Sequence, residues 1–439
     1  MLTVETTIIA PATAPGRGGI SVIRISGPSS KVVVEKMCGP LGAPWQFRRC
    51  DIRNKNKRII DSGLVVFFEA PHSYTGEDVV ELHCHGNPNL VDLVMVEGLS
   101  LGLKLAEPGE FTKRAFLNNK IDLAQAESVA DLIAAQTEEA ILAANNSLSG
   151  RFSEGINKSI ASLVSCRVSV EASLDFPEEV PEGGVAEGLL LEVEAQISYL
   201  GSVLEAAKQG LKIREGFGVA VVGAPNAGKS TLVNRLAQDD LVITSDVPGT
   251  TRDSIRANIN LSGVVVEFID TAGMRKNPVS QIEREGIKRT QKAIEGATLV
   301  LHVVDANKRG GVDSINKNSI KVLNKCDLLD SIPLCEDGEV CVSAATGFGF
   351  DNLIELVLIR LGLSSSTETS LLSRRRHVDS LESALFFLNE SASSLKKEEG
   401  MELVAENLLA AQKELGEITN PVSSDDLLGE IFSEFCLGK

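Results

Sequence analysis

The stretch Gly223–Ser230, GAPNAGKS, decides the fold of the central part of the chain. The apolar run Val219–Val222 before it predicts a buried strand, and Thr231–Leu236 after it has helical spacing. A strand that passes through a glycine-rich turn into a helix directs backbone N–H groups and the helix dipole towards one point. This arrangement suits a polyphosphate, with Lys229 expected at the β- and γ-phosphates and Ser230 expected to bind Mg²⁺.

Three later motifs each follow an apolar, strand-like run. They are Asp270–Gly273 (DTAG), Asn324–Asp327 (NKCD) and Ser343–Ala344 (SA). We expect Asp270 beside the metal, and Asp327 can accept hydrogen bonds from guanine N1–H and its 2-amino group, which adenine lacks. Four motifs in this order at strand ends predict one ligand along one edge of a doubly wound sheet. They resemble the motifs of GTPases of the translation-factor-related class.

Length and composition limit the class of protein. The chain has 439 residues, enough for about three domains, and 43% of them are hydrophobic. Its net charge of −17 argues against a general attraction to nucleic acid or anionic membranes, so RNA would need local basic patches such as Arg374–Arg376. The eight cysteines lack paired spacing, which is typical of reduced thiols. Without a signal peptide, and with no apolar run near the roughly 18 residues of a membrane span, we expect a soluble cytoplasmic protein.

The pattern of residue types along the sequence predicts a multidomain protein with α/β and α+β parts. Residues 1–118 are expected to form an α+β domain, with strands at 22–25, 63–68 and 78–84. Residues 216–363 form the P-loop α/β domain. The flanks 119–215 and 364–439 are rich in helical periodicity, and the simplest interpretation is one discontinuous helical domain with the nucleotide domain inserted into it. The predicted helical segments are 122–148, 155–175, 186–213, 376–398, 401–416 and 424–436.

The flanks also carry family motifs. These are Pro15–Gly19 (PGRGG), Ser73–Asp78 (SYTGED), Glu81–Gly86 (ELHCHG), Pro108–Phe116 (PGEFTKRAF), Asn119–Glu127 (NKIDLAQAE) and the terminal Phe435–Lys439 (FCLGK). Together with Gly249–Asp253 (GTTRD), they resemble the tRNA modification GTPase family called MnmE or TrmE over nearly the whole chain. The chain departs from the family in ending Cys-Leu-Gly-Lys rather than Cys-Ile-Gly-Lys, in Asn420 for a usual glycine, and in a shorter 305–340 segment.

The resemblance implies a fold and an activity. The N-terminal domain is expected to bind a tetrahydrofolate, 5-formyl or 5,10-methylene, and to form a homodimer. With an FAD-dependent, MnmG- or GidA-like partner, in an expected heterotetramer, the family installs an aminomethyl-type group at C5 of the wobble uridine of certain tRNAs. With glycine as the amine, the product is carboxymethylaminomethyl. The alternatives are a GTPase switch for ribosome assembly, against which the N-terminal and C-terminal motifs argue, and a partner protein that binds GTP without hydrolysing it.

GTP hydrolysis needs a positioned water and neutralised phosphate charge. Many GTPases have glutamine after Asp-x-x-Gly, but Met274 stands here, and no arginine finger is assigned, although Arg252 and Arg275 lie nearby. The resemblance assigns the water-orienting role to Glu283 and replaces the arginine finger by K⁺. The alternative is that Glu283 is a solvated helix residue.

The resemblance gives the following ligand sets. The K⁺ positions are Asn226, Ser245, Val247 and Thr250, and Mg²⁺ would take Ser230 and Thr251. The GTP positions are Asn226, Ala227, Gly228, Lys229, Ser230, Thr231, Ser245, Asp246, Val247, Pro248, Gly249, Thr250, Thr251, Asp270, Thr271, Ala272, Gly273, Asn324, Lys325, Cys326, Asp327, Ser343, Ala344 and Ala345. The folate positions are Arg24, Glu81, Lys120 and Lys439.

Two cysteine-containing segments allow more than one interpretation. Cys436 near the C-terminus is either a nucleophile for the group transfer or a packed side chain on an apolar helix face. His83 and His85 are expected on one face of a strand, with Cys84 on the other. They are either metal ligands or, as the missing second ligand pair favours, packed and hydrogen-bonded residues.

Overall fold

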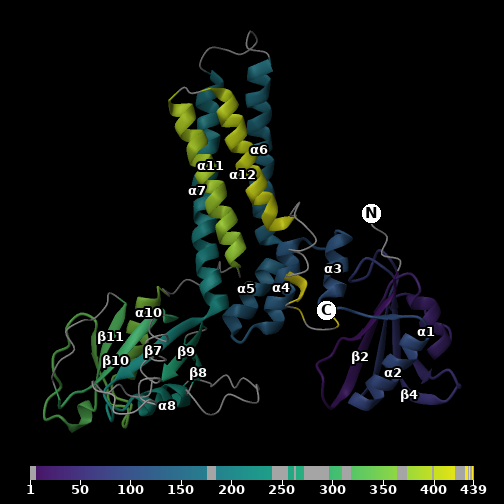
Figure 1. Cartoon of the computed structure of the whole chain (residues 1–439), viewed down its shortest axis with the longest axis horizontal. Helices are drawn as coiled ribbons and strands as arrows, with labels where there is room; N and C mark the ends of the chain where they lie inside the picture. Colours follow the sequence, from purple (N-terminus) through teal and green to yellow (C-terminus); the bar gives the residue numbers. More distant parts are fainter. Residues whose placement is uncertain are drawn as a thin grey trace, which may run out of the picture. The chain divides into compact units, whose positions relative to one another are not determined.

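The computed structural model describes most of the chain (Figure 1). The described residues are 6–175, 184–239, 256–261, 264–270, 296–308, 318–362, 373–397, 400–420, 431–433, 435 and 438. Contacts divide the chain into two units, which we describe separately. The first comprises Met1–Ile133, Ser147–Gly201 and Asp379–Lys439, and the second comprises Ala134–Asn146 and Ser202–Val378.

The N-terminal region of the first unit contains a six-stranded sheet, sheet A, in the order β3-β4-β5-β2-β1-β6. Its strands are β1 (Ile8–Pro11), β2 (Gly18–Ser26), β3 (Arg48–Arg53), β4 (Ile59–Phe68), β5 (Val79–Gly86) and β6 (Lys104–Leu105). The pairs are antiparallel except β1 with β6. The three predicted strands are confirmed as parts of β2, β4 and β5. The short β1, β3 and β6 were not predicted, because they lack long apolar alternation.

Side chains alternate between the two faces of sheet A. One face forms the main core, in which Ile9, Ile23 and Leu82 pack against α1 (Ser30–Cys38) and α2 (Pro88–Ser100). On the other face, the neighbouring residue Ile8 packs against Phe111 of α3 (Glu110–Leu117). Residues next to core positions along the strands therefore line this second face.

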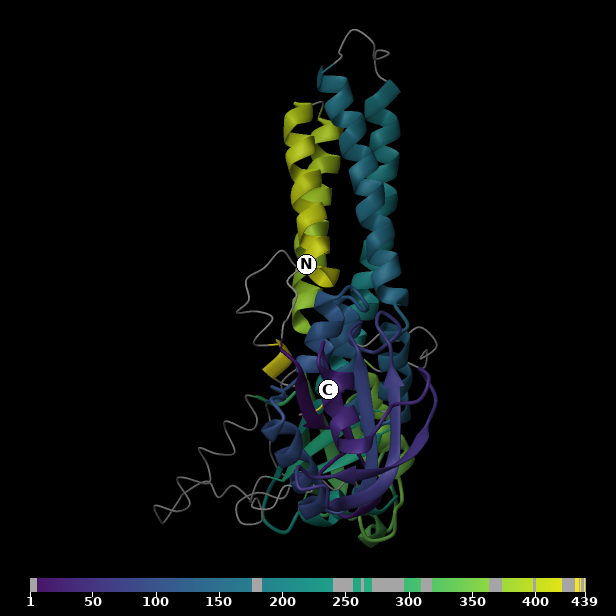
Figure 2. The same cartoon turned by 90° about the vertical axis from the view of Figure 1, so that its right-hand side faces the viewer.

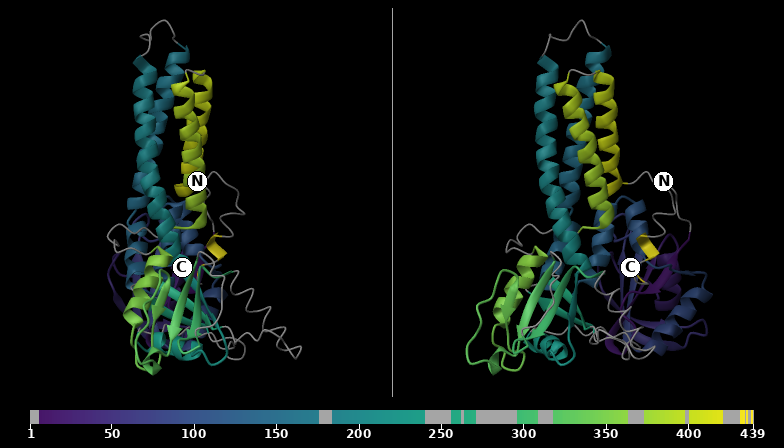
Figure 3. Two further views of the ribbon diagram at one scale, coloured as in Figure 1. Left: turned by 90° about the vertical axis from the view of Figure 1, so that its left-hand side faces the viewer. Right: turned by 60° about the vertical axis from the view of Figure 1, so that its left-hand side comes forward.

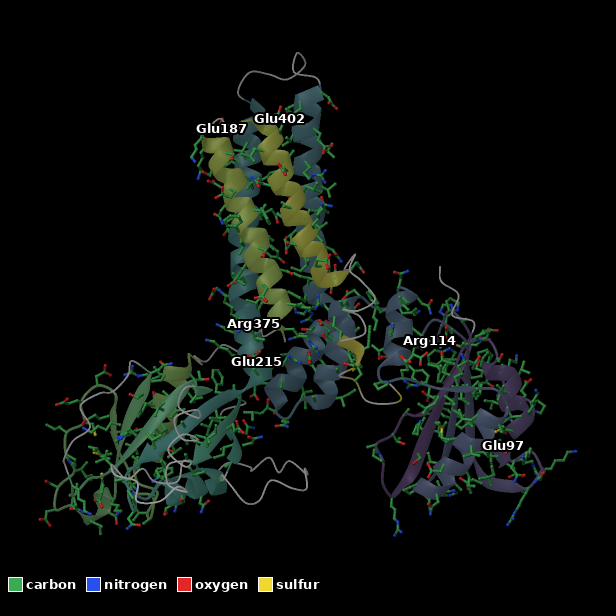
Figure 4. All side chains as sticks on the ribbon, in the orientation of Figure 1. Glu97, Arg114, Glu187, Glu215, Arg375 and Glu402 are labelled. Carbon is green, nitrogen blue, oxygen red and sulfur yellow. The ribbon has the colours of Figure 1, made fainter. Side chains whose placement is uncertain are left out.

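The PGEFTKRAF motif contributes a buried arginine to this region. Arg114 of α3 is 2% exposed and donates hydrogen bonds to Glu77 at 3.0 Å, to Glu110 at 2.8 Å and to the carbonyl of Thr6 at 2.8 Å. Figure 4 labels Arg114 where α3 meets sheet A. Ser26 donates to the same Glu77 at 2.7 Å. Because removing one member would leave a buried charge unpaired, this network fixes α3 and the loop that contains Glu77 to sheet A.

Helices from both sides of the nucleotide domain form one bundle. They are α6 (Arg151–Asp175), α7 (Gly184–Glu215), α11 (Arg375–Lys396) and α12 (Met401–Thr419), and two shorter helices, α4 (Leu123–Ala134) and α5 (Glu138–Leu148), precede them in the chain. Figures 2 and 3 show α6, α7, α11 and α12 side by side along their length. Arg167 bonds Gln412 at 2.9 Å, and Lys396 pairs with Glu194 at 2.8 Å, so segments more than 200 residues apart are joined.

The predicted helical stretch 122–148 is two helices, α4 and α5. The Thr137 hydroxyl accepts a hydrogen bond from the N–H of Ala140 at 3.2 Å, which is the geometry of a helix N-cap. The apolar periodicity continues across this break, so periodicity alone did not reveal it. The predicted segment 424–436 lies largely outside the described residues, as does the polar segment 364–370.

The second unit contains sheet B, in the order β12-β11-β10-β7-β9-β8. Its strands are β7 (Phe217–Gly223), β8 (Arg256–Leu261), β9 (Val264–Asp270), β10 (Leu299–Asp305), β11 (Ser319–Asn324) and β12 (Glu339–Cys341). All pairs are parallel except β8 with β9, and α8 (Lys229–Asp239) and α10 (Phe350–Leu361) pack on the sheet. The predicted α/β fold is thus confirmed, with β7 central and its carboxyl end leading into α8.

Candidate functional site

The loop between β7 and α8 has the conformation that its glycines permit. Gly228 has φ 92°, and a Cβ there would collide with the side-chain amide of Asn324. Asn226 also adopts a left-handed conformation, at φ 64°, which asparagine tolerates better than most residues. The loop therefore curls closely around the start of α8, where the first backbone N–H groups have no helical acceptor.

Lys229 is held inside this loop. It is 7% exposed, and its Nζ donates to the carbonyls of Gly223 at 3.1 Å and Ala224 at 3.2 Å. Its ammonium group thus lies at the mouth of the loop, beside the start of α8. A buried cation and a helix N-terminus in one place form an anion-binding arrangement. Ser230 and Thr231, the next residues of α8, are exposed.

Asn324 at the end of β11 connects three of the predicted motifs. Its side chain is 1% exposed and donates to the carbonyl of Ala227 at 2.8 Å. Its Oδ1 accepts hydrogen bonds from the N–H of Lys325 at 2.8 Å and the N–H of Ala344 at 3.0 Å. One amide thereby joins the phosphate loop, the NKCD loop and the Ser343–Ala345 loop, and it fixes their positions relative to one another.

The NKCD loop turns sharply after Asn324. Lys325 has φ 67°, and Asp327 lies exposed in the short 3-10 helix η1 (Cys326–Leu328). The Nζ of Lys325 pairs with Asp305, at the end of β10, at 2.8 Å. The hydrogen bond from Lys325 is the main reason that the pKa of the Asp305 carboxyl lies below its usual value. This ion pair, which the sequence did not reveal, anchors Lys325 beside the exposed carboxylate of Asp327.

Asp270 ends β9, next to β7 in the sheet, with its backbone paired to Val221. The phosphate loop, Asp270, the NKCD loop and the Ser343–Ala345 loop therefore all follow the carboxyl ends of strands at one edge of sheet B. The other predicted positions lie outside the described residues. They are Ser245, Asp246, Val247, Pro248, Gly249, Thr250, Thr251, Thr271, Ala272, Gly273, Glu283, Cys436 and Lys439.

A second cluster lies on the face of sheet A that α1 and α2 leave uncovered. Arg24, between the core residues Ile23 and Ile25, is paired in register with Glu81 of β5. Its Nε donates to Glu81 at 2.9 Å, with side chains 17% and 16% exposed. The guanidinium lies 5.2 Å from the ring centre of Tyr74, within the range of a cation–π contact.

A pocket opens beside this ion pair. Its volume is about 480 Å³, in the range of sites for small organic ligands. It is lined by Trp45, Phe68, His72, Ser73, Tyr74, Val79, Glu81 and Lys120. Trp45 and Phe68 make an edge-to-face contact with centroids 4.7 Å apart. Of the predicted folate residues, Glu81 and Lys120 line the pocket, and Arg24 contacts Glu81. The aromatic walls were not predicted, because they come from separate loops and strands.

The two histidines of β5 have other partners. Cys84 is buried in the core, whereas His83 and His85 lie on the opposite face, as predicted. His83 is 3.4 Å from Glu81 and its ring contacts Phe47, and His85 lies 2.8 Å from Asp61. Across the described ranges, no group of three or more His, Cys, Asp and Glu side chains is arranged to hold a metal. The contacts of His83 and His85 with Glu81, Phe47 and Asp61 favour the packed, hydrogen-bonded interpretation of this motif.

The described part of the C-terminal tail reaches the N-terminal sheet. Phe432 and Phe435 pack in a core cluster with Leu123 of α4. Gly438 is buried and has φ 89°, and a Cβ there would collide with the carbonyl of Pro11 at the end of β1. Gly438 therefore lies next to sheet A.

The nucleotide edge defines a class of protein. A central P-loop strand in a mostly parallel sheet, with an NKxD loop and a Ser-Ala loop at the same edge, is the architecture of a P-loop GTPase domain. Among the described helices, none is long and apolar enough to span a bilayer.

Comparison with known proteins identifies the family. The family model for the MnmE helical domain matches residues 123–436, and that for the GTP-binding protein TrmE N-terminus matches residues 7–120. The tRNA modification GTPase MnmE of Nitrosospira multiformis is 44% identical over 100% of both chains. Its counterpart from Coxiella burnetii is 41% identical over 99% of this chain and 98% of its own. The G domain of the T. maritima FeoB iron transporter matches 33% of this chain and 98% of its own, with 25% identity and a TM-score of 0.25. The chain belongs to the MnmE family of tRNA modification GTPases, and it is an enzyme that hydrolyses GTP in tRNA modification.

Proposed function

We propose that the chain is a K⁺-stimulated GTPase that, with an FAD-dependent partner, installs an aminomethyl-type group at C5 of the wobble uridine of certain tRNAs. With glycine as the amine, the group is carboxymethylaminomethyl. A tetrahydrofolate supplies the one-carbon unit. One observation carries the proposal: a single chain combines a nucleotide edge on sheet B with an aromatic pocket around the Arg24–Glu81 pair on sheet A.

The pocket has the chemistry that a reduced folate requires. A pterin ring is flat and carries amino and ring N–H donors, which suit stacking on Trp45 or Tyr74 and a carboxylate acceptor such as Glu81. The glutamyl tail carries carboxylates, which suit Lys120 on the rim. Lys120 donates to the carbonyl of Pro71 at 2.9 Å, so its ammonium is held near the opening. Lys439 would add a cation from the tail, which Gly438 brings to sheet A.

The nucleotide edge fits GTP with Mg²⁺ and K⁺. Ser230 supplies a hydroxyl oxygen beside Lys229, and hard cations such as Mg²⁺ prefer oxygen ligands. Asn226 is exposed in the loop, and its side-chain oxygen would be one K⁺ ligand, with Ser245, Val247 and Thr250 completing the set. When bound, the two ions would neutralise the charge that develops on the phosphates. Glu283 would orient the attacking water, and Cys436 would act as a nucleophile in the group transfer.

The assembly follows the same proposal. Residues 1–118 would bind folate and join two copies of the chain, 119–215 with 364–439 would form the helical domain, and 216–363 would bind GTP. The FAD-dependent, MnmG-like partner would complete a heterotetramer that acts on tRNA in the cytoplasm. The variant Cys436→Ser tests the proposed nucleophile. It should retain folate binding and GTP turnover but lose modification.

Nucleoside analysis of total tRNA from cells with and without this protein tests the proposed chemistry. Loss of an aminomethyl-type wobble uridine in the deletion strain, and its return with the wild-type gene, is the expected result. Unchanged wobble nucleosides together with a defect in ribosome assembly would support the switch alternative instead.

Measured GTP turnover tests the cation requirement. Turnover should rise strongly when K⁺ replaces Na⁺ at equal ionic strength, and Asn226→Ala should remove most of the difference. Equal turnover in the two salts would contradict K⁺ stimulation but would leave the modification chemistry open.

A further inference from the structure

The turn between β3 and β4 is strongly basic in an acidic protein. We call residues 48–58, RRCDIRNKNKR, the basic hairpin. Its cations are Arg48, Arg49, Arg53, Lys55, Lys57 and Arg58, and its only acid is Asp51. Six positive charges minus one negative charge give +5 over this segment, whereas the whole chain carries −17. Such a local reversal of sign creates a positive potential that attracts anions to one place on the surface.

The positive charges at the tip of the basic hairpin are accessible to a ligand from solvent. Arg53 pairs with Asp51 at 2.8 Å, and Arg48 donates to the carbonyl of Cys38 at 2.9 Å. By contrast, Lys55, Lys57 and Arg58 are exposed, and within the part of the chain that the structure describes none of them forms an ion pair with a carboxylate. Three cations at one turn are therefore presented to solvent.

The turn is held in one shape by its own hydrogen bonds. The side-chain oxygen of Asn54 accepts from the N–H of Asn56 at 3.1 Å and of Arg58 at 3.0 Å. The backbone N–H of Asn54 bonds the carbonyl of Arg58 at 3.0 Å, and that of Lys57 bonds the carbonyl of Asn54 at 2.8 Å. A turn that is ordered before binding loses little conformational entropy when a ligand arrives.

Lys57 occupies a strained position. Its φ is 61°, in the left-handed region, which is unfavourable for residues other than glycine, asparagine and aspartate. Glycine or asparagine would fit this turn with less strain, so a lysine here places a charge at a structural cost. The strain at this exposed turn therefore points to a function for the charge of Lys57.

The other basic segment suggested by the sequence, Arg374–Arg376, is less available. Arg374 is 9% exposed, and both it and Arg376 already have interaction partners. Arg375, labelled at the start of α11 in Figure 4, is the first residue of a helix, where the positive end of the dipole disfavours further positive charge. The basic hairpin is thus the better candidate surface for a polyanion.

We propose that the basic hairpin binds the phosphodiester backbone of the substrate tRNA. The inference rests on the proposed function, since it names the surface by which that substrate is held. Lysine and arginine at a turn contact phosphates without selecting bases, so this contact would position the tRNA and would not choose its sequence. An RNA is favoured over an anionic membrane or an acidic protein because the family acts on tRNA.

The test is tRNA binding by a triple variant of the full-length protein, Lys55→Gln with Lys57→Gln and Arg58→Gln. Glutamine keeps the length and polarity of the side chains and is no more strained than lysine at position 57. Binding of a fluorescently labelled tRNA should weaken by about tenfold or more near 0.1 M salt. The slope of log K against log salt should fall by roughly 2–3, because about three phosphate contacts are lost.

A second triple variant serves as a matched control. Lys104→Gln, Lys158→Gln and Lys413→Gln remove the same charge from exposed positions on β6, α6 and α12. Lys104 lies on the strand at the opposite edge of sheet A from β3. This variant should bind tRNA as the wild type does. Thermal unfolding and GTP turnover should be unchanged in both variants, which shows that both sheets are folded.

The outcomes separate this inference from the proposed function. Equal tRNA affinity and salt slope in the hairpin variant and the wild type would overturn the hairpin site, even if nucleoside analysis upholds the modification chemistry. A hairpin-dependent association with phosphatidylserine vesicles, without tRNA binding, would overturn it in favour of a lipid surface. Normal tRNA binding by the wild type with unchanged wobble nucleosides in the deletion strain would instead contradict the proposed function alone.

Discussion

The two candidate sites are built on sheets in different ways. In sheet B, the ligand site lies along one edge, where loops follow the carboxyl ends of parallel strands and backbone groups and one buried amide hold the geometry. In sheet A, the pocket lies on a face, where side chains such as Arg24 and Glu81 project from the middle of antiparallel strands. An edge site is therefore encoded in contiguous motifs, whereas a face site is encoded in residues scattered along the chain.

The two sites should therefore be sensitive to different kinds of change. The edge depends on backbone approach, as at Gly228, so it tolerates few changes in conformation. The face depends on the charge and shape of individual side chains, which can be exchanged while the strands remain paired. Changes at one site should leave the other intact, because the described residues of the two sites belong to different sheets and their loops.

The largest effect is expected at the chain end. Deleting Leu437–Lys439 should abolish wobble modification and weaken binding of 5-formyl-tetrahydrofolate, because Gly438 packs against the carbonyl of Pro11 and brings the tail to sheet A. Turnover of GTP should persist, since its site lies on sheet B. Calorimetry with the folate beside a turnover assay measures both. Lys439→Gln removes the charge but keeps the packing of the tail. It should also weaken folate binding, while GTP turnover persists. Unaltered folate affinity after the deletion would show that the tail contributes only packing and does not bind folate.

The catalytic step at the edge provides the next test. Glu283→Ala should lower GTP turnover by about 100-fold or more, the usual scale for a group that positions or activates water. The Kd for GTP should hardly change, and folate binding should be untouched. Single-turnover kinetics with labelled GTP measures the effect. Nearly normal turnover in the variant would show instead that Glu283 is a solvated helix residue.

Base selection tests the geometry of the NKCD loop. Asp327→Asn replaces an acceptor by a donor, so the variant should prefer xanthosine triphosphate to GTP. An unpaired buried donor costs about 1–3 kcal/mol, which corresponds to roughly 5- to 150-fold in affinity. Competition binding of the two nucleotides measures the change, with the wild type as reference. Retained preference for GTP would mean that Asp327 does not face the base.

The face site should respond to one side chain of β5. Glu81→Gln should weaken binding of a reduced folate by roughly 10- to 150-fold, because a hydrogen bond to a charged group contributes about 1.5–3 kcal/mol. It also leaves Arg24 without its carboxylate, so thermal unfolding must be followed in parallel. His85→Gln on the same strand, which removes the contact with Asp61, is a matched control and should bind folate normally. Equal folate affinity in both variants would contradict a role for Glu81.

The smallest effect is expected from the ion pair at the edge of sheet B. Since Lys325 lowers the pKa of Asp305 in the folded state, the pair adds stability above the ordinary pKa of 3.8 and loses it as pH falls through the lowered pKa. Asp305→Asn should therefore reduce the free energy of unfolding at pH 7 by less than about 1 kcal/mol. The difference between variant and wild type should vanish in strong acid. Urea unfolding at several pH values measures it, and a pH-independent difference would argue against the ion pair as its source.

The sequence determined the fold class, the order of elements at the nucleotide edge and the strands β2, β4 and β5. It could do so because a P-loop, an NKxD loop and their preceding apolar strands are local patterns, in which neighbours along the chain are neighbours in space. The joining of α6 and α7 with α11 and α12 was also predictable, since long amphipathic segments on both flanks need a shared core. The break at Thr137 was not, because the apolar periodicity runs through it.

Tertiary structure alone decided the contacts between residues distant in the sequence. Asn324 was identified as a motif residue, but only the fold shows that its amide also fixes Ala227 and Ala344. The walls of the pocket come together in space from separate parts of the chain: Phe68 ends β4, whereas Trp45 and Tyr74 lie in loops, and the N–H of Trp45 bonds the carbonyl of Phe67 at 2.8 Å. Hydrophobic pattern specifies which side of a strand is buried. It does not specify which strands become neighbours, and this pairing creates the face site.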